Sequence, residues 1–170
     1  MKSVITKWIK KYLGQFPKND INCDISHSCS FAMVKNLILG KWIFIGPKCF
    51  LDAKGSIYID DGVVISSRVT ILTSNHNYRD CVSMPYSGED VKREVRIKKG
   101  VWIGYGAIIM PGVVLNEGSI VAAGSVVTKN VPSGCIVGGN PAIKISERQG
   151  DSWLNLLNDN KFYIKNKYTK

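Results

Sequence analysis

The chain has 170 residues, of which 45% are hydrophobic, and this size and composition fit a single domain that buries its own core. No apolar run approaches the roughly 20 residues that cross a bilayer, and the N-terminus lacks the apolar stretch and cleavage site of a signal peptide, so we expect a soluble, cytoplasmic protein. The formal net charge of +10 favours an anionic partner without deciding between nucleic acid, a membrane surface and a phosphorylated small molecule.

Cysteine and histidine usage limits the chemistry that the chain can support. The five cysteines are an odd number and include no C-x-x-C pair, which argues against a disulfide framework and a zinc cage. Two histidines are too few for a zinc site built from three imidazoles. We therefore expect free thiols and no metal.

The N-terminal segment SVITKWIKKYL predicts a basic amphipathic helix within residues 1–14. Apolar residues share one face and lysines mostly occupy the other. Such a helix can cap the end of the domain, the interpretation that we favour, or lie on an anionic membrane surface.

A period of six residues runs from residue 21 to residue 146. It restarts with a shift of two residues near KGS (54–56), and it places His27 in the core column, which favours packing over chemistry for that histidine. Smaller residues mostly follow four positions after each large one. The large column contains Ile21, His27, Met33, Leu39, Ile45 and Leu51, then Ile59, Ile65 and Ile71, and then Ile97, Ile103, Ile109, Leu115, Val121 and Val127.

A period of six fits neither an α-helix nor a meander of hairpins. It fits an all-β solenoid in which each hexad is one short strand plus a corner, three hexads complete a triangular coil, and stacked coils bury the aliphatic column. Gly104, Gly112, Gly118 and Gly124 recur near the expected corners, where glycine relieves backbone strain.

The repeat stops at His76, within ILTSNHNYRD, and an unrepeated segment of residues 77–96 follows. We expect this segment to be a projecting functional loop. Alternation of side chains predicts that Ile71 and Asn75 face the core and that His76 faces outward at the base of the loop. Imidazole titrates near neutral pH, so His76 could act as a general base, although a lone loop histidine is more often simply solvated.

After the repeat, residues 150–170 predict a helical tail. Trp153, Leu154, Leu157 and Ile164 supply its apolar face, which would pack on the solenoid or on a neighbouring subunit.

Several motifs together resemble one known family. The hexads IGYGAI, IMPGVV, LNEGSI and VAAGSV, with TSNHN, VWIG, AGSVVTKNVP and GGNPA, are similar to those of the hexapeptide-repeat acyltransferases, and the similarity covers residues 21–146. The closest likeness is to the subgroup that O-acetylates sugars and polysaccharides and to the xenobiotic acetyltransferases. The resemblance implies a left-handed parallel β-helix, a homotrimer and acetyl-CoA as the acetyl donor.

The resemblance also implies roles for particular residues. His76 matches the family's catalytic histidine, and Trp102 matches a tryptophan near the thioester and the acceptor, where a structural role is equally plausible. Ala123, Thr128 and Lys129 match residues that contact the cofactor. Corner packing and a solvated lysine are the alternative, but corners alone would not require TK next to VP, so we favour cofactor binding. Gly104 and Tyr105 belong to the same expected cofactor surface.

Two positions depart from the family pattern. Tyr105 follows WIG where relatives often have a small residue, and Ile143 follows NPA where they often have a basic one. Lys144 and Arg148 are therefore the expected partners of the nucleotide phosphate. For the acceptor, we expect contacts from Asn75, Trp102 and Asp52, the last of which could instead be a turn residue.

Together these features favour an acetyl-CoA-dependent O-acetyltransferase that acts on a sugar of a surface polysaccharide or its precursor. Acetylation of an amino group on a nucleotide-linked sugar, or of an antibiotic, stays open within the same class. A non-catalytic β-helical scaffold is the alternative from a different class. No nucleic-acid motif occurs, so we assign the basic charge to CoA phosphates and an acidic saccharide or its carrier.

Overall fold

The computed structural model describes residues 22–79 and 81–168. The predicted N-terminal helix of residues 1–14 lies outside these residues. The strands of the first half are β1 (Asp24–Ile25), β2 (Ser30–Ala32), β3 (Leu37–Leu39), β4 (Phe44–Ile45), β5 (Phe50–Asp52), β6 (Ile57–Ile59), β7 (Val64–Ile65), β8 (Thr70–Leu72) and β9 (Ser74–Asn75). Those of the second half are β10 (Val91–Lys92), β11 (Val95–Ile97), β12 (Trp102–Ile103), β13 (Ile108–Ile109), β14 (Val114–Leu115), β15 (Ile120–Val121), β16 (Val126–Val127), β17 (Cys135–Gly139) and β18 (Ala142–Glu147). The helices are the 3-10 helix η1 (Val34–Asn36), α2 (Ser152–Asn158) and α3 (Tyr163–Tyr168).

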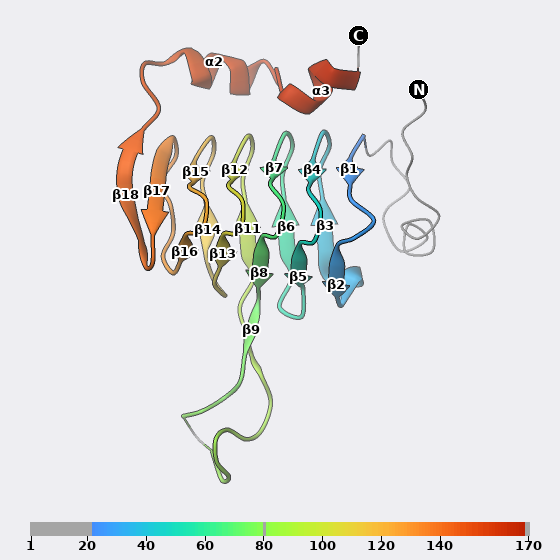
Figure 1. Ribbon diagram of the computed structural model, residues 1–170, viewed down its shortest axis with the longest axis vertical. Coiled ribbons are helices and arrows are strands. Elements are labelled where there is room, and N and C mark those ends of the chain that lie inside the picture. Colours follow the sequence, from blue (N-terminus) through green and yellow to red (C-terminus); the bar gives the residue numbers. More distant parts are fainter. Residues whose placement is uncertain (1–21, 80, 169–170) are drawn as a thin grey trace.

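All strands except β9 and β10 form three sheets that wrap one prism, and the predicted left-handed parallel β-helix is confirmed. Sheet A has the order β1-β4-β7-β12-β15-β17-β18, sheet B has β16-β13-β8-β5-β2, and sheet C has β14-β11-β6-β3. The chain visits A, B and C in turn, and each strand of these sheets except β18 pairs in parallel with the equivalent strand one coil away. In Figure 1 the coils stack side by side from β1 to β18, with the helices along one side and a long loop projecting from the other.

The interior of the prism is the aliphatic column that the period predicts. Register keeps like residues above one another: Ile45 pairs with Ile65, which pairs with Ile103. The large column residues of the central coils are at most 2% exposed, which places them among the most buried side chains. These residues are Ile59, Ile65, Ile71, Ile97, Ile103 and Ile109.

The prediction that His27 faces the core is wrong, because His27 is exposed and lies in a turn. The reason is a second shift in the six-residue period, in addition to the one predicted near residues 54–56. Helix η1 adds one turn between β2 and β3, so the first coil buries Cys29 and partly buries Phe31, and Met33, which has φ 54°, is 47% exposed. The predicted shift at residues 54–56 occurs at the equivalent corner one coil later.

The C-terminal helices α2 and α3 lie against the corner between sheets C and A (Figure 1). Glycine is required there both for its positive φ and for close approach: a Cβ on Gly62 would lie 2.1 Å from the Phe162 ring, and one on Gly118 would lie 2.6 Å from the Trp153 ring. Phe162 and Ile164 are buried in this contact region. No helix in residues 22–79 or 81–168 is long and apolar enough to cross a membrane.

The last strands differ from the hexad pattern. Strand β17 continues sheet A in parallel, but β18 returns antiparallel to it, with Gly138 opposite Ile143. This hairpin closes the solenoid before the chain reaches α2. All five cysteines, which lie within the described residues, are free thiols.

The burial pattern predicts very different costs for two isoleucine truncations. Ile103→Ala should lower the free energy of unfolding by about 2–5 kcal/mol, because Ile103 is 0% exposed and its removal leaves a cavity between packed coils. The control Ile143→Ala, at a residue 67% exposed, should cost about 0.5 kcal/mol or less. Urea denaturation of both variants measures the difference, and equal losses would contradict the assigned core.

Candidate active site

The projecting loop begins and ends as a two-stranded ribbon. Strand β9 leaves the corner between sheets B and C and pairs antiparallel with β10, with Asn75 opposite Val91. Because the ribbon departs from the prism, Asn75 is exposed and Thr73 takes the buried position, so the prediction that Asn75 faces the core is wrong. The repeat resumes at the buried Val95, two residues before Ile97, where the sequence predicts that the large column begins again.

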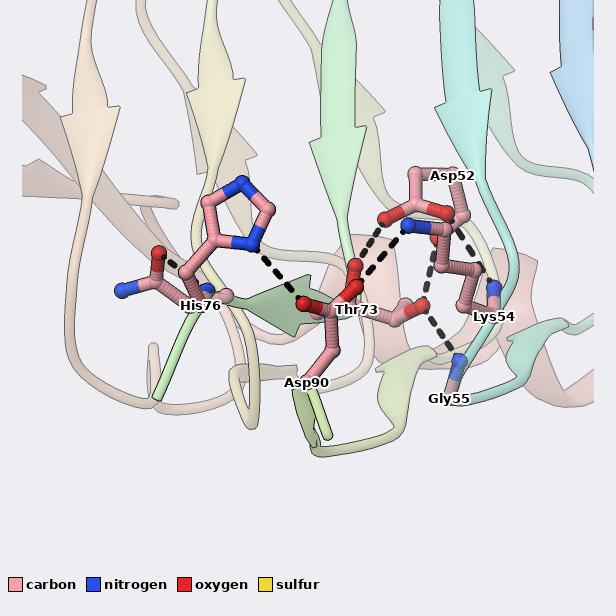
Figure 2. Close-up of polar contacts among 8 residues, drawn as sticks. Asp52, Lys54, Gly55, Thr73, His76 and Asp90 are labelled. Atoms are coloured by element: carbon pink, nitrogen blue, oxygen red, sulfur yellow. Dashed lines mark hydrogen bonds and ion pairs between the residues drawn. The ribbon is translucent and has the colours of Figure 1, made fainter. Parts of the chain in front are cut away.

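The His76 side chain points outward at the base of the loop, where two loop residues hold its ring. Its Nδ1 lies 2.8 Å from Oδ1 of Asp90, and its ring stacks on Tyr86 with centroids 3.9 Å apart and an interplanar angle of 5°. Its backbone N–H donates to Oδ1 of Asn75 at 2.9 Å. Figure 2 shows the imidazole directed at Asp90.

A carboxylate on Nδ1 decides which imidazole nitrogen can act as a base. An ionised carboxylate only accepts hydrogen bonds, so neutral His76 carries its proton on Nδ1 and donates it to Asp90. The Nε2 lone pair is then free for an incoming proton. The same geometry suits a general base in acyl transfer.

Asp90 is shared between His76 and a lysine from the coil below. Its Oδ2 accepts a bond from Nζ of Lys54 at 3.0 Å. The hydrogen bond from Lys54, and after it the one from His76, holds the pKa of the Asp90 carboxyl below its ordinary value. The same contact raises the pKa of Lys54. Asp90 is therefore ionised at neutral pH, as the donation from Nδ1 requires.

Asp52, a predicted acceptor contact, is only 6% exposed and already bonded within the chain. Its Oδ2 accepts a bond from the Ser74 hydroxyl at 2.6 Å, and its Oδ1 accepts one from the Lys54 backbone N–H at 3.3 Å. Thr73 donates its hydroxyl to the Asp52 carbonyl and accepts the Gly55 N–H at 2.7 Å. These contacts, drawn in Figure 2, fasten β9 to the coil below and so fix the start of the loop.

A cavity of about 280 Å³ lies beside His76. Residues of the loop form one wall, and two later B-to-C corners form the other. Of the predicted cofactor residues, the structure brings Thr128 into this cavity, and the exposed Lys129 follows it at the same corner. The described residues that line it are Asn75, His76, Asn77, Tyr78, Arg79, Val91, Arg93, Met110, Pro111 and Thr128.

Three other predicted residues occupy the opposite edge of sheet B, at the corner between sheets A and B. Gly104 and Ala123 stack on successive coils, because a Cβ on Gly104 would lie 2.7 Å from the Ala123 nitrogen. Tyr105 is 52% exposed, with the Arg68 guanidinium 5.9 Å from its ring centroid. None of these three residues is among the described residues that line the cavity beside His76.

The remaining predicted residues lie on or near sheet A. Trp102, in β12, donates its indole N–H to the Ser66 hydroxyl at 3.3 Å. Arg148 donates its Nε–H to the Gly118 carbonyl at 2.6 Å, and burial lowers the pKa of its guanidinium. Both residues line a second cavity, of about 580 Å³, beneath α2 and α3, whereas Lys144 on β18 pairs with Glu147. The structure therefore separates Lys144 and Arg148 from His76.

Sequence reasoning missed Asp90, Lys54 and Tyr86. Asp90 belongs to the SGED segment, which resembled a simple turn, and its contact with a histidine 14 positions earlier depends on the path of the loop. The sequence offered one signal for this contact: an acidic residue, Asp90, lies in the loop that starts at His76. In residues 22–79 and 81–168, no group of three or more His, Cys, Asp or Glu side chains is placed to hold a metal ion.

Comparison with known proteins identifies the family of the chain. The family profile "Bacterial transferase hexapeptide (six repeats)" matches residues 94–129. Protein CapG of Staphylococcus aureus is 32% identical over an alignment of 178 positions, which covers 99% of this chain and 96% of that protein. The chain belongs to the hexapeptide-repeat acyltransferase family, which confirms the resemblance found in the sequence.

Other relatives match over part of their length. Nodulation protein L of Rhizobium meliloti (strain 1021) is 45% identical over 107 residues, 63% of this chain and 57% of that protein. Galactoside O-acetyltransferase of Lactococcus lactis is 30% identical over 109 residues, 64% of this chain and 52% of that protein. The chain thus spans little more than half the length of these two relatives.

A solved structure shows the same fold with a ligand. It is a hexapeptide-repeat acetyltransferase of Vibrio cholerae O1 biovar eltor in complex with acetyl coenzyme A, with a TM-score of 0.67 and 26% identity. The match covers 84% of this chain and 78% of that chain.

The shared carboxylate predicts how the loop responds to pH. The pKa of the Asp90 carboxyl is lower in the folded loop than its ordinary value of 3.8. Its ion pairs therefore stabilise the folded loop fully at pH values above 3.8, and this stabilisation is lost as the pH falls through the lower pKa of the folded state. Asp90→Asn should therefore speed amide hydrogen exchange in residues 74–92 at pH 7, and the difference from wild type should shrink in acid. Asp159→Asn, which breaks an exposed ion pair with Lys161, is the control and should leave the loop unchanged. Equal amide hydrogen exchange of the loop in Asp90→Asn and wild type at pH 7 would contradict the role of Asp90 in anchoring the loop.

Proposed function

We propose that the protein is an acetyl-CoA-dependent O-acetyltransferase that acetylates a hydroxyl of a sugar in a surface polysaccharide or its precursor. The observation that carries the proposal is the bond between His76 Nδ1 and Asp90, which leaves Nε2 free as a base at the mouth of a cavity. Family membership, a galactoside O-acetyltransferase among the relatives and an acetyl-CoA complex among the similar structures support the reaction class.

In the proposed reaction His76 moves one proton twice. Nε2 takes the proton of the acceptor hydroxyl as that oxygen bonds to the thioester carbonyl carbon. The carbon–sulfur bond then breaks, and the leaving thiolate takes the proton back from Nε2. The products are an acetyl ester and CoA. Asp90 acts as a positioning residue, because it holds the ring and offsets the charge of the imidazolium.

The residues that we expect to contact the cofactor lie on more than one face of the prism. Thr128 and Lys129 lie at the His76 corner, whereas Gly104, Tyr105 and Ala123 lie at the other edge of sheet B and Trp102 lies on sheet A. We propose that a homotrimer brings the second group of one copy opposite the first group of its neighbour, so that the pantetheine arm is enclosed from two sides. Lys144 and Arg148 stay candidates for the nucleotide phosphate, and Asp52 and Asn75 for the acceptor.

Replacing the proposed base should remove catalysis and spare binding. His76→Ala should slow acetyl transfer by about 10²–10⁴-fold while the affinity for acetyl-CoA in calorimetry stays the same. His27→Ala, which removes the exposed second histidine, is the matched control and should keep full turnover. Thiol detection of released CoA measures the rate, and cleavage of the product by hydroxylamine distinguishes an ester from the amide of an N-acetyltransferase. Near-normal turnover in His76→Ala would refute its role as base.

A shared site predicts that activity depends on assembly. Mass and turnover should fall together on dilution or in mild denaturant, because each monomer holds only part of the cofactor site. Light scattering and CoA release, measured on the same samples, test this dependence. A folded monomer with full turnover would contradict the trimer proposal.

A further inference from the structure

The cavity beside His76 is cationic. Two arginines from opposite ends of the loop, Arg79 and Arg93, line it, and no carboxylate occurs among the described residues of its lining. The cavity therefore offers positive charge where an acceptor hydroxyl would approach Nε2 of His76.

Within the described residues, neither arginine pairs with a carboxylate. Asp90 binds Lys54 and His76, and Glu94 binds Arg96 at 2.7 Å. Glu89 is exposed and is not among the residues that line the cavity. Asp52, which is buried, accepts bonds from within its own corner. Both guanidinium groups thus keep their donors available for a ligand.

Arg93 is also held in place before any ligand arrives. Its backbone N–H donates to the Thr73 carbonyl at 2.8 Å, at the root of the ribbon. Its aliphatic stem lies against the next corner, since a Cβ on Gly112 would come within 3.2 Å of its Cδ. A fixed stem reduces the entropy lost when the guanidinium forms a paired hydrogen bond to an oxyanion.

Resting on the function proposed above, we infer that the acceptor carries an anionic group, a carboxylate or a phosphate, next to the hydroxyl that is acetylated. The phosphates of CoA cannot supply this group, because the whole pantetheine arm separates them from the thioester carbon that must lie at His76. The anion therefore belongs to the acceptor, which would be an acidic sugar or a sugar phosphate. Arg79 and Arg93 would bind it by charge-assisted hydrogen bonds.

Binding of matched sugars tests this inference without acetyl transfer. Galactose, galacturonate and galactose 6-phosphate share one ring and differ at one carbon, so calorimetry at low salt isolates the anion, and the two acids distinguish carboxylate from phosphate. We expect at least one acid to bind about tenfold or more tightly than galactose, the scale of a hydrogen bond to a charged group. The preference should weaken as salt is added.

Arginine variants test which residues cause the preference for an acidic sugar over galactose. Arg79→Gln and Arg93→Gln should each reduce it, and the double variant should abolish it. Arg96→Gln is the charge-matched control, because Arg96 lies close in sequence but pairs with Glu94 outside the cavity lining. Equal affinity for galactose and both acids, no detectable binding of any of the three, or a preference that survives in the double variant would each overturn the inference.

Acetyl-CoA titrations of the same proteins separate this inference from the proposed function. Wild type and the arginine variants should bind acetyl-CoA equally. A loss of acetyl-CoA affinity in Arg79→Gln or Arg93→Gln as large as the loss of sugar affinity would assign the arginines to the cofactor and overturn the inference. A wild-type protein that fails to bind acetyl-CoA, yet binds acidic sugars, would refute the proposed function alone.

Discussion

The structure depends on one constraint, which is that every coil must place its large aliphatic residues directly above those of the coil below. Parallel pairing sets this register, as in the stack of Ile45, Ile65 and Ile103. Because each repeat can bury its apolar side only against its neighbours, strands cannot slip without exposing the column. Extra residues are therefore accommodated only at corners, where they do not disturb the stack.

That constraint explains why the candidate site forms where it does. Additional residues occur at the B-to-C corner of three successive coils: helix η1 in the first, residues 53–56 in the second, and the projecting loop in the third. Stacking places Lys54 of the second coil beside the root of the loop in the third. As a result, Asp90 meets a lysine and a histidine that are far apart in sequence.

The sequence predicted the features that repeat and missed those that depend on a chain path. Burial of Ile59, Ile71 and Ile109 follows from the period, and the outward position of His76 follows from where the period ends. The phase of the first coil did not follow, because the three residues of η1 resemble ordinary hexad positions, and this hid the exposure of His27. The contact between His76 and Asp90 did not follow either, since it forms only when β9 and β10 pair.

The two ends of the projecting loop differ in a way that bears on assembly. Its base is fixed within the chain by the ribbon, by the ion pairs of Asp90 and by the stacking of Tyr86 on His76. Its tip instead presents apolar side chains, with Val82 98% exposed and Met84 87% exposed. Exposed apolar residues at a loop tip are stabilised when a second surface covers them. In the proposed trimer, the tip could dock on a neighbouring copy while the base keeps His76 aligned within its own chain.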